Sequence, residues 1–63
     1  MNDEAFNMSM RKFLKQVGVT SQQAIETQVR EGKATNGKLK AKVVLTIEGT
    51  DLNHVVEGEI DLG

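Results

Sequence analysis

Hydrophobic side chains in the N-terminal part of the chain recur at the spacing of an α-helix. The members of this stripe are Phe6, Met10, Phe13, Leu14 and Val17. Their separations of four, seven, eight and eleven residues from the first member match a 3.6-residue period. Asn2 precedes them as a helix cap, and the acidic residues that follow it suit the positive end of the helix dipole. The pattern predicts an amphipathic helix from about residue 3 to residue 17.

A second helix is predicted directly after the first. Gly18 suits the left-handed position that ends many helices. The segment from Thr20 to Gln23 has the composition of a capping box, in which the first side chain caps and the last reaches back. Ile25 and Val29 give the new helix a narrow apolar stripe that ends before Gly32. We therefore expect a helical hairpin over residues 3–31.

The C-terminal half of the chain changes to the two-residue period of β-strands. Residues 32–38 have turn chemistry and no apolar period, which predicts a flexible linker. From Leu39 to Glu48, and again from His54 to Leu62, apolar and polar residues alternate. The pattern predicts an antiparallel β-hairpin over residues 39–62, with a loop at residues 49–52.

One pairing register satisfies both the alternation and the charges. If Ile47 lies opposite His54, Lys42 faces Glu59 and Lys40 faces Asp61. A slip by one residue would turn these charges toward the core. The expected fold is therefore α+β, with two N-terminal amphipathic helices packed on a C-terminal antiparallel β-hairpin (α-α-β-β) in one small domain, residues 1–63.

A domain of 63 residues is near the lower limit of autonomous folding. The chain has no Cys and one His, so neither a disulfide nor a structural zinc site can staple it. The remaining routes to stability are well-formed helices or the burial of extra surface by association. We expect a homodimer or another protein partner.

The chemistry of the chain argues against an enzyme. His54 has no thiol and no second histidine beside it in the sequence, and no Gly-rich phosphate loop is present. We expect no catalytic residue, no cofactor and no bound metal. The longest apolar run, residues 43–45, is too short to span a membrane, and the acidic N-terminus does not resemble a secretory signal. We expect a cytoplasmic protein without a membrane segment.

Four apolar or weakly polar side chains are predicted on the outside of the fold. Val44, Thr46 and Val55 fall on the outer face of the hairpin, and Met8 lies opposite the apolar stripe of the first helix. A two-stranded sheet also leaves both edges open, and proteins usually cover such edges. These four residues are the predicted interface of a non-enzymatic, self-associating interaction domain.

A nucleic-acid-binding domain is the alternative interpretation. The predicted turn at residues 18–20 resembles a helix-turn-helix, in which a Gln-rich second helix reads DNA. The contacts would come from Ser21, Gln22, Gln23 and Arg30, with Lys33 and Lys38 on phosphate. Ala24 stands where an apolar docking residue is expected, and the hairpin loop carries Asp51 but no cation. These defects favour the interaction domain.

Three stretches of the chain resemble a family of short bacterial proteins of unknown function. They are residues 6–21, residues 45–49 (Leu-Thr-Ile-Glu-Gly) and residues 54–60 (His-Val-Val-Glu-Gly-Glu-Ile). The resemblance covers nearly the whole chain apart from residues 32–38. It implies a stand-alone domain with two helices followed by a hairpin, and it offers no catalytic residue to transfer.

Overall fold

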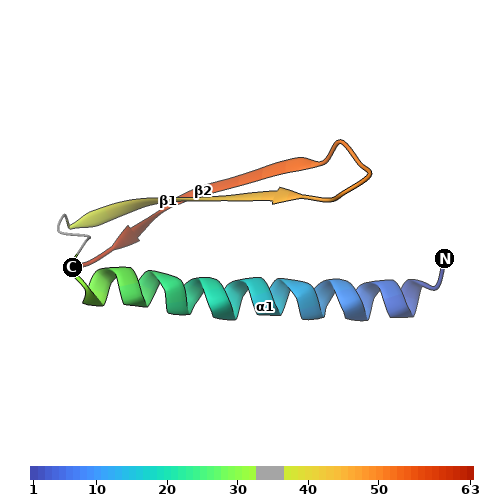
Figure 1. The fold of residues 1–63 in the computed structure, drawn as a ribbon, viewed down its shortest axis with the longest axis horizontal. Helices are drawn as coiled ribbons and strands as arrows, with labels where there is room; N and C mark the ends of the chain where they lie inside the picture. Colours follow the sequence, from blue (N-terminus) through green and yellow to red (C-terminus); the bar gives the residue numbers. More distant parts are fainter. Residues whose placement is uncertain (33–36) are drawn as a thin grey trace.

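One long helix lies along a two-stranded β-hairpin in the computed structural model, which describes residues 1–32 and 37–63. The helix α1 spans Asp3–Arg30, and the strands β1 and β2 span Lys38–Thr46 and Asn53–Asp61 (Figure 1). The predicted α+β class and the antiparallel hairpin are confirmed. The predicted pair of helices is wrong, because the chain is helical without a break from residue 3 to residue 30.

The side chains that were expected to break the helix are accommodated within it. Gly18 does not adopt the left-handed conformation that a helix-ending glycine needs. The Thr20 hydroxyl, expected to cap a new helix, instead donates to the Gln16 carbonyl at 2.8 Å. The Thr27 hydroxyl makes the equivalent bond to the Gln23 carbonyl at 3.0 Å. Bonds to the carbonyl four residues earlier satisfy these hydroxyls inside a continuous helix.

Both ends of α1 follow the sequence signals. The side-chain oxygen of Asn2 accepts a hydrogen bond from the Ala5 backbone amide at 3.1 Å, as a helix cap should. At the other end Gly32 has a φ of 75°, and its amide donates to the Val29 carbonyl at 3.0 Å. The predicted cap at Asn2 and the predicted end at Gly32 are confirmed. The predicted linker falls mainly on residues 33–36, which lie outside the described residues.

Gly18→Ala is expected to stabilise the fold by about 0.5–1 kcal/mol, because alanine favours a helix interior over glycine. A Cβ atom built on Gly18 meets nothing within 4 Å, so no clash offsets this gain. Urea denaturation followed by circular dichroism measures the change. A loss of stability would mean that Gly18 occupies a left-handed helix end after all.

The hairpin adopts a register two residues away from the predicted one. Leu45, not Ile47, lies opposite His54, and the lysine–acid pairs become Lys38–Asp61, Lys40–Glu59 and Lys42–Glu57. The cause is the turn. The Thr50 amide and hydroxyl both donate to the Ile47 carbonyl, at 3.2 and 2.8 Å, and Gly49 has a φ of 81°. This geometry matches a type II turn with glycine at its third position, so Ile47 belongs to the loop and not to β1.

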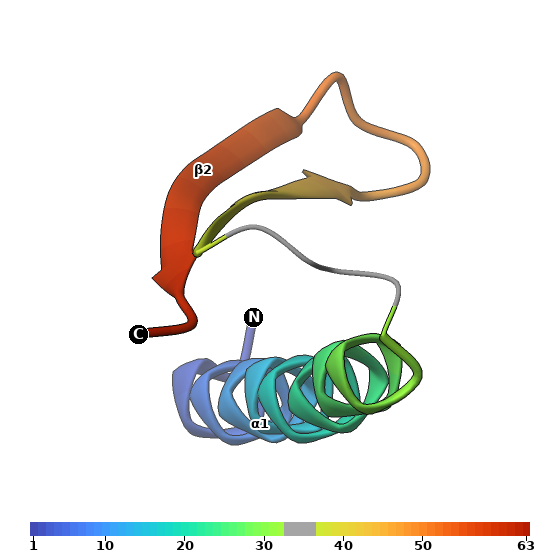
Figure 2. The same cartoon turned by 90° about the vertical axis from the view of Figure 1, so that its left-hand side faces the viewer.

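The helix and the hairpin form two layers that meet only loosely. The strands run along α1, and the hairpin loop lies over the N-terminal half of the helix (Figures 1 and 2). Within the described part of the chain, no Cα atom of α1 comes within 8 Å of a Cα atom of either strand. The radius of gyration is 15.2 Å, whereas a compact chain of this length has about 11 Å. None of the described residues is fully buried.

Candidate functional site

Six apolar side chains stand on the facing sides of the two layers but remain half exposed. We call this set the open core; its members are Phe6, Phe13, Leu14, Val43, Ile47 and Val56. Their exposed fractions lie between 47 and 53%. The helix members belong to the predicted apolar stripe. Val43 shares the helix-facing side of β1 with Leu45, because residues two apart in a strand point the same way, and Val56 lies opposite Val43. Ile47, in the loop, lies beside Leu45 and the side chains of α1.

Four members of the open core, Phe6, Phe13, Leu14 and Ile47, line a cleft between the N-terminal half of α1 and the loop end of the hairpin. The cleft has a volume of about 410 Å³. Its walls are formed by Phe6, Ser9, Met10, Phe13, Leu14, Leu45, Ile47 and Leu52. The only hydroxyl among them, on Ser9, already donates to the carbonyls of Ala5 and Phe6 at 2.8 and 3.1 Å. The lining therefore offers an apolar surface and no charged group.

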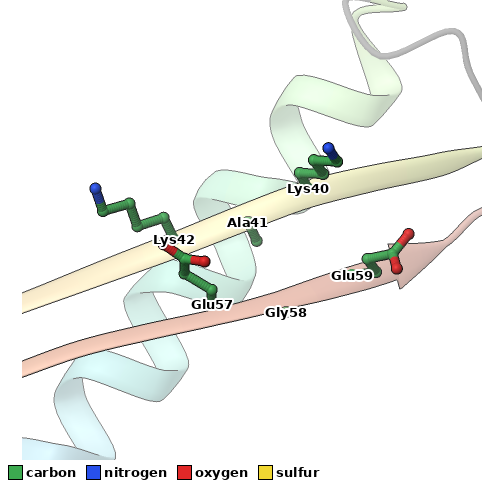
Figure 3. A pocket seen from close by; sticks show the side chains of 6 residues that line it. All are labelled: Lys40, Ala41, Lys42, Glu57, Gly58 and Glu59. Atoms are coloured by element: carbon green, nitrogen blue, oxygen red, sulfur yellow. The ribbon is translucent and has the colours of Figure 1, made fainter.

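The outer face of the hairpin has a different chemistry. Three lysines of β1 lie opposite three acidic residues of β2 in every second rung of the hairpin. A shallow hollow of about 460 Å³ lies among four of these side chains, Lys40, Lys42, Glu57 and Glu59, with Ala41 and Gly58 between them along the strands (Figure 3). Charges of both signs alternate around it and stay exposed to solvent. Such a charged face is well hydrated. The described residues contain no group of three metal-binding side chains.

The predicted interface residues are only partly brought together. In the observed register Val44 and Val55 lie directly opposite each other, and Thr46 follows in the same face opposite Asn53. Met8 does not join them. It is 66% exposed on the helix, and by helical geometry it points away from the stripe that faces the hairpin. The outer face of the hairpin and the outer face of α1 are opposite surfaces of the molecule.

The predicted nucleic-acid contacts are not arranged as a helix-turn-helix. Ser21, Gln22, Gln23 and Arg30 all lie within the continuous helix, so the expected turn between two helices is wrong. Ser21 is half-buried, whereas the other three are exposed. Lys38 lies opposite Asp61 on the hairpin, and Lys33 falls outside the described residues.

Sequence reasoning identified the open-core residues as apolar but expected them to be covered. It packed two helices on the hairpin, with the second at the edge of the core, whereas the structure has a single continuous helix over these residues. The signal that could have warned of this was the narrow stripe beyond Val17, where Ser21, Ala24 and Gln28 occupy positions that would otherwise be large and apolar.

The fold defines the chain as a small α+β domain, with one helix and one hairpin in residues 1–32 and 37–63. It belongs to a family of unknown function, described as "Family of unknown function (DUF6494)", whose model matches residues 1–63. Searches of curated proteins and of solved structures gave no match. No helix in the described ranges is long and apolar enough to cross a membrane.

Proposed function

We propose that this chain is a non-enzymatic protein-interaction domain that associates with a second copy of itself. The observation that carries the proposal is the amount of surface that one chain leaves uncovered. The accessible surface is 5772 Å² for a mass of 6.9 kDa. A folded monomer of this mass normally exposes about 4,000 Å².

The excess of about 1,800 Å² is more than one partner contributes to an ordinary interface. A typical stable complex buries roughly 800 Å² on each partner, and obligate dimers bury more. With no fully buried residue among those described, the single chain also lacks the core that holds small domains together. Dimerisation would cover the excess surface and would give the domain a buried core.

The charge distribution is compatible with self-association. Residues 1–42 hold eight basic and four acidic side chains, and residues 43–63 hold five acidic and no basic ones. The net charge of −1 gives little overall repulsion between copies, while the two halves attract one another. The helix-turn-helix alternative loses its structural basis with the single helix. The absence of enzymatic activity, the absence of a cofactor and the cytoplasmic location stay predictions from the sequence.

Sedimentation equilibrium is expected to give a mass of two chains, in place of the 6.9 kDa of one chain. The dissociation constant should change little between low and high salt, because apolar burial is not screened by ions. Interference optics are needed, since the chain has no Trp or Tyr.

A single-chain mass at every concentration and salt would overturn the homodimer. Binding to random duplex DNA that weakens steeply with salt would instead point to phosphate contacts and would contradict the proposal.

A further inference from the structure

Two surfaces of this chain could hold a second copy, and their chemistry separates them. The outer face of the hairpin offers the Val44–Val55 pair, flanked by three rungs of lysine and carboxylate. Stacking a second chain on that face would take these charges out of water, which is unfavourable unless each finds a partner of good geometry. The cleft side carries the open core and no charged lining residue.

The cleft is also a poor match for a small polar ligand. Ligand sites usually combine an apolar lining with a few polar groups that orient the ligand. Here the Ser9 hydroxyl is already engaged by two backbone carbonyls of its own helix. The walls that remain are apolar side chains of the kind that fill a protein core.

The exposure of the open core indicates what is missing from it. Val43 and Val56 form a cross-strand pair on the helix-facing side, yet they are 47 and 53% exposed because α1 does not cover them. Phe6 and Phe13 project from α1 with similar exposure. The apolar stripe of α1 and the helix-facing side of the hairpin are therefore both incompletely covered. A second copy can cover both, because its hairpin can pack on the stripe and its helix can pack on the hairpin.

The charged side chains of α1 do not obstruct the same occupant. Arg11, Lys12 and Lys15 lie away from the apolar stripe, on the same side of α1 as Met8. A second copy can therefore lay its apolar stripe across the hairpin without taking these cations out of water. A twofold axis then repeats the same contact in the other direction.

We propose that the open core is the dimer interface, with the N-terminal half of α1 of each copy packed on the helix-facing side of the partner's hairpin. Phe6 and Phe13 of one chain then contact Val43, Ile47 and Val56 of the other. This inference rests on the proposed self-association, and it moves the interface away from the outer-face residues that the sequence favoured.

Adjacent residues of β1 provide a matched pair of variants. Val43 and Val44 are neighbours with nearly equal exposure, 47 and 51%, but they lie on opposite faces of the hairpin. Val43→Lys is expected to raise the dimer dissociation constant roughly 30-fold or more, as removal of an interface hot spot does. Val44→Lys should leave it within about threefold, as expected for a position outside the interface. Circular dichroism checks that both variants fold.

A measurement on the unaltered protein keeps the test independent of folding. Phe6 and Phe13 are the only phenylalanines and the chain has no Tyr or Trp, so their ring protons give uncluttered NMR signals. In a mixed dimer of ¹³C-labelled and unlabelled chains, filtered NOEs should connect these rings to the methyl groups of Val43 and Val56. Intermolecular NOEs to Val44 and Val55 instead, or a dimer without the predicted NOEs, would overturn the interface but leave the dimer standing. A monomeric sample would overturn both proposals.

Discussion

Ser21→Pro is expected to lower the free energy of unfolding by about 3 kcal/mol or more, because Ser21 lies inside the continuous helix α1. Proline there removes the backbone donor and forces its ring against the carbonyl of Val17, four residues earlier. A domain of this size has only about 3–5 kcal/mol of net stability, so the variant should be largely unfolded at room temperature. Loss of the helical circular dichroism signal is the measurement.

Ser21→Ala is the matched control, since alanine keeps the backbone amide and favours a helix. It should leave stability unchanged or slightly higher. The same proline tests the two-helix arrangement, in which residue 21 would be the first residue of the second helix, a position that proline tolerates well. A folded Ser21→Pro variant with normal helix content would therefore contradict the single helix.

The helix could be predicted in extent but not in continuity. Asn2 and Gly32 mark its ends in the sequence, and both act as predicted. Gly18 and Thr20 carry local signals of an end and a start, yet each is also tolerated inside a helix at modest cost. Cap residues are compatible with a break in a helix, but they do not force one. Whether the helix breaks depends on the tertiary contacts available to each half, which the local sequence does not specify.

The hairpin register is a second feature that the local sequence pattern does not determine. Lysines recur at every second residue from 38 to 42, and acidic residues recur at every second residue from 57 to 61. A shift of two residues therefore keeps the same faces and replaces one set of lysine–acid pairs by another. The pattern excluded a slip by one but could not exclude a slip by two. The turn at Gly49 decides, because it draws Ile47 out of the strand.

The predicted position of the interaction site depended on the wrong prediction of two helices. With two helices, the apolar stripe around Phe13 would have been sealed and only the outer valines would have remained for a partner. With one helix, the stripe stays an exposed apolar surface next to the hairpin. The composition and length predict that the chain associates, but the position of the proposed interface could follow only from the arrangement of the layers.

Phe13→Ala is expected to destabilise the dimer by about 3–5 kcal/mol, the range for truncating a buried phenylalanine. In an isolated chain Phe13 is 50% exposed, so the same substitution should cost only about half as much. Urea denaturation at two protein concentrations separates the cases. Unfolding midpoints of an associated protein rise with concentration, and those of a monomer do not.

Met8→Ala is the control on the same helix, because Met8 points away from the cleft and is 66% exposed. Its effect should stay within about 0.5 kcal/mol, as for most surface substitutions. Phe13→Ala should also weaken the concentration dependence of the midpoint, since it removes contacts made across the interface, whereas Met8→Ala should preserve that dependence. Equal effects of the two substitutions would mean that the ring of Phe13 is no better covered in solution than the Met8 side chain, and the open core would then have no partner.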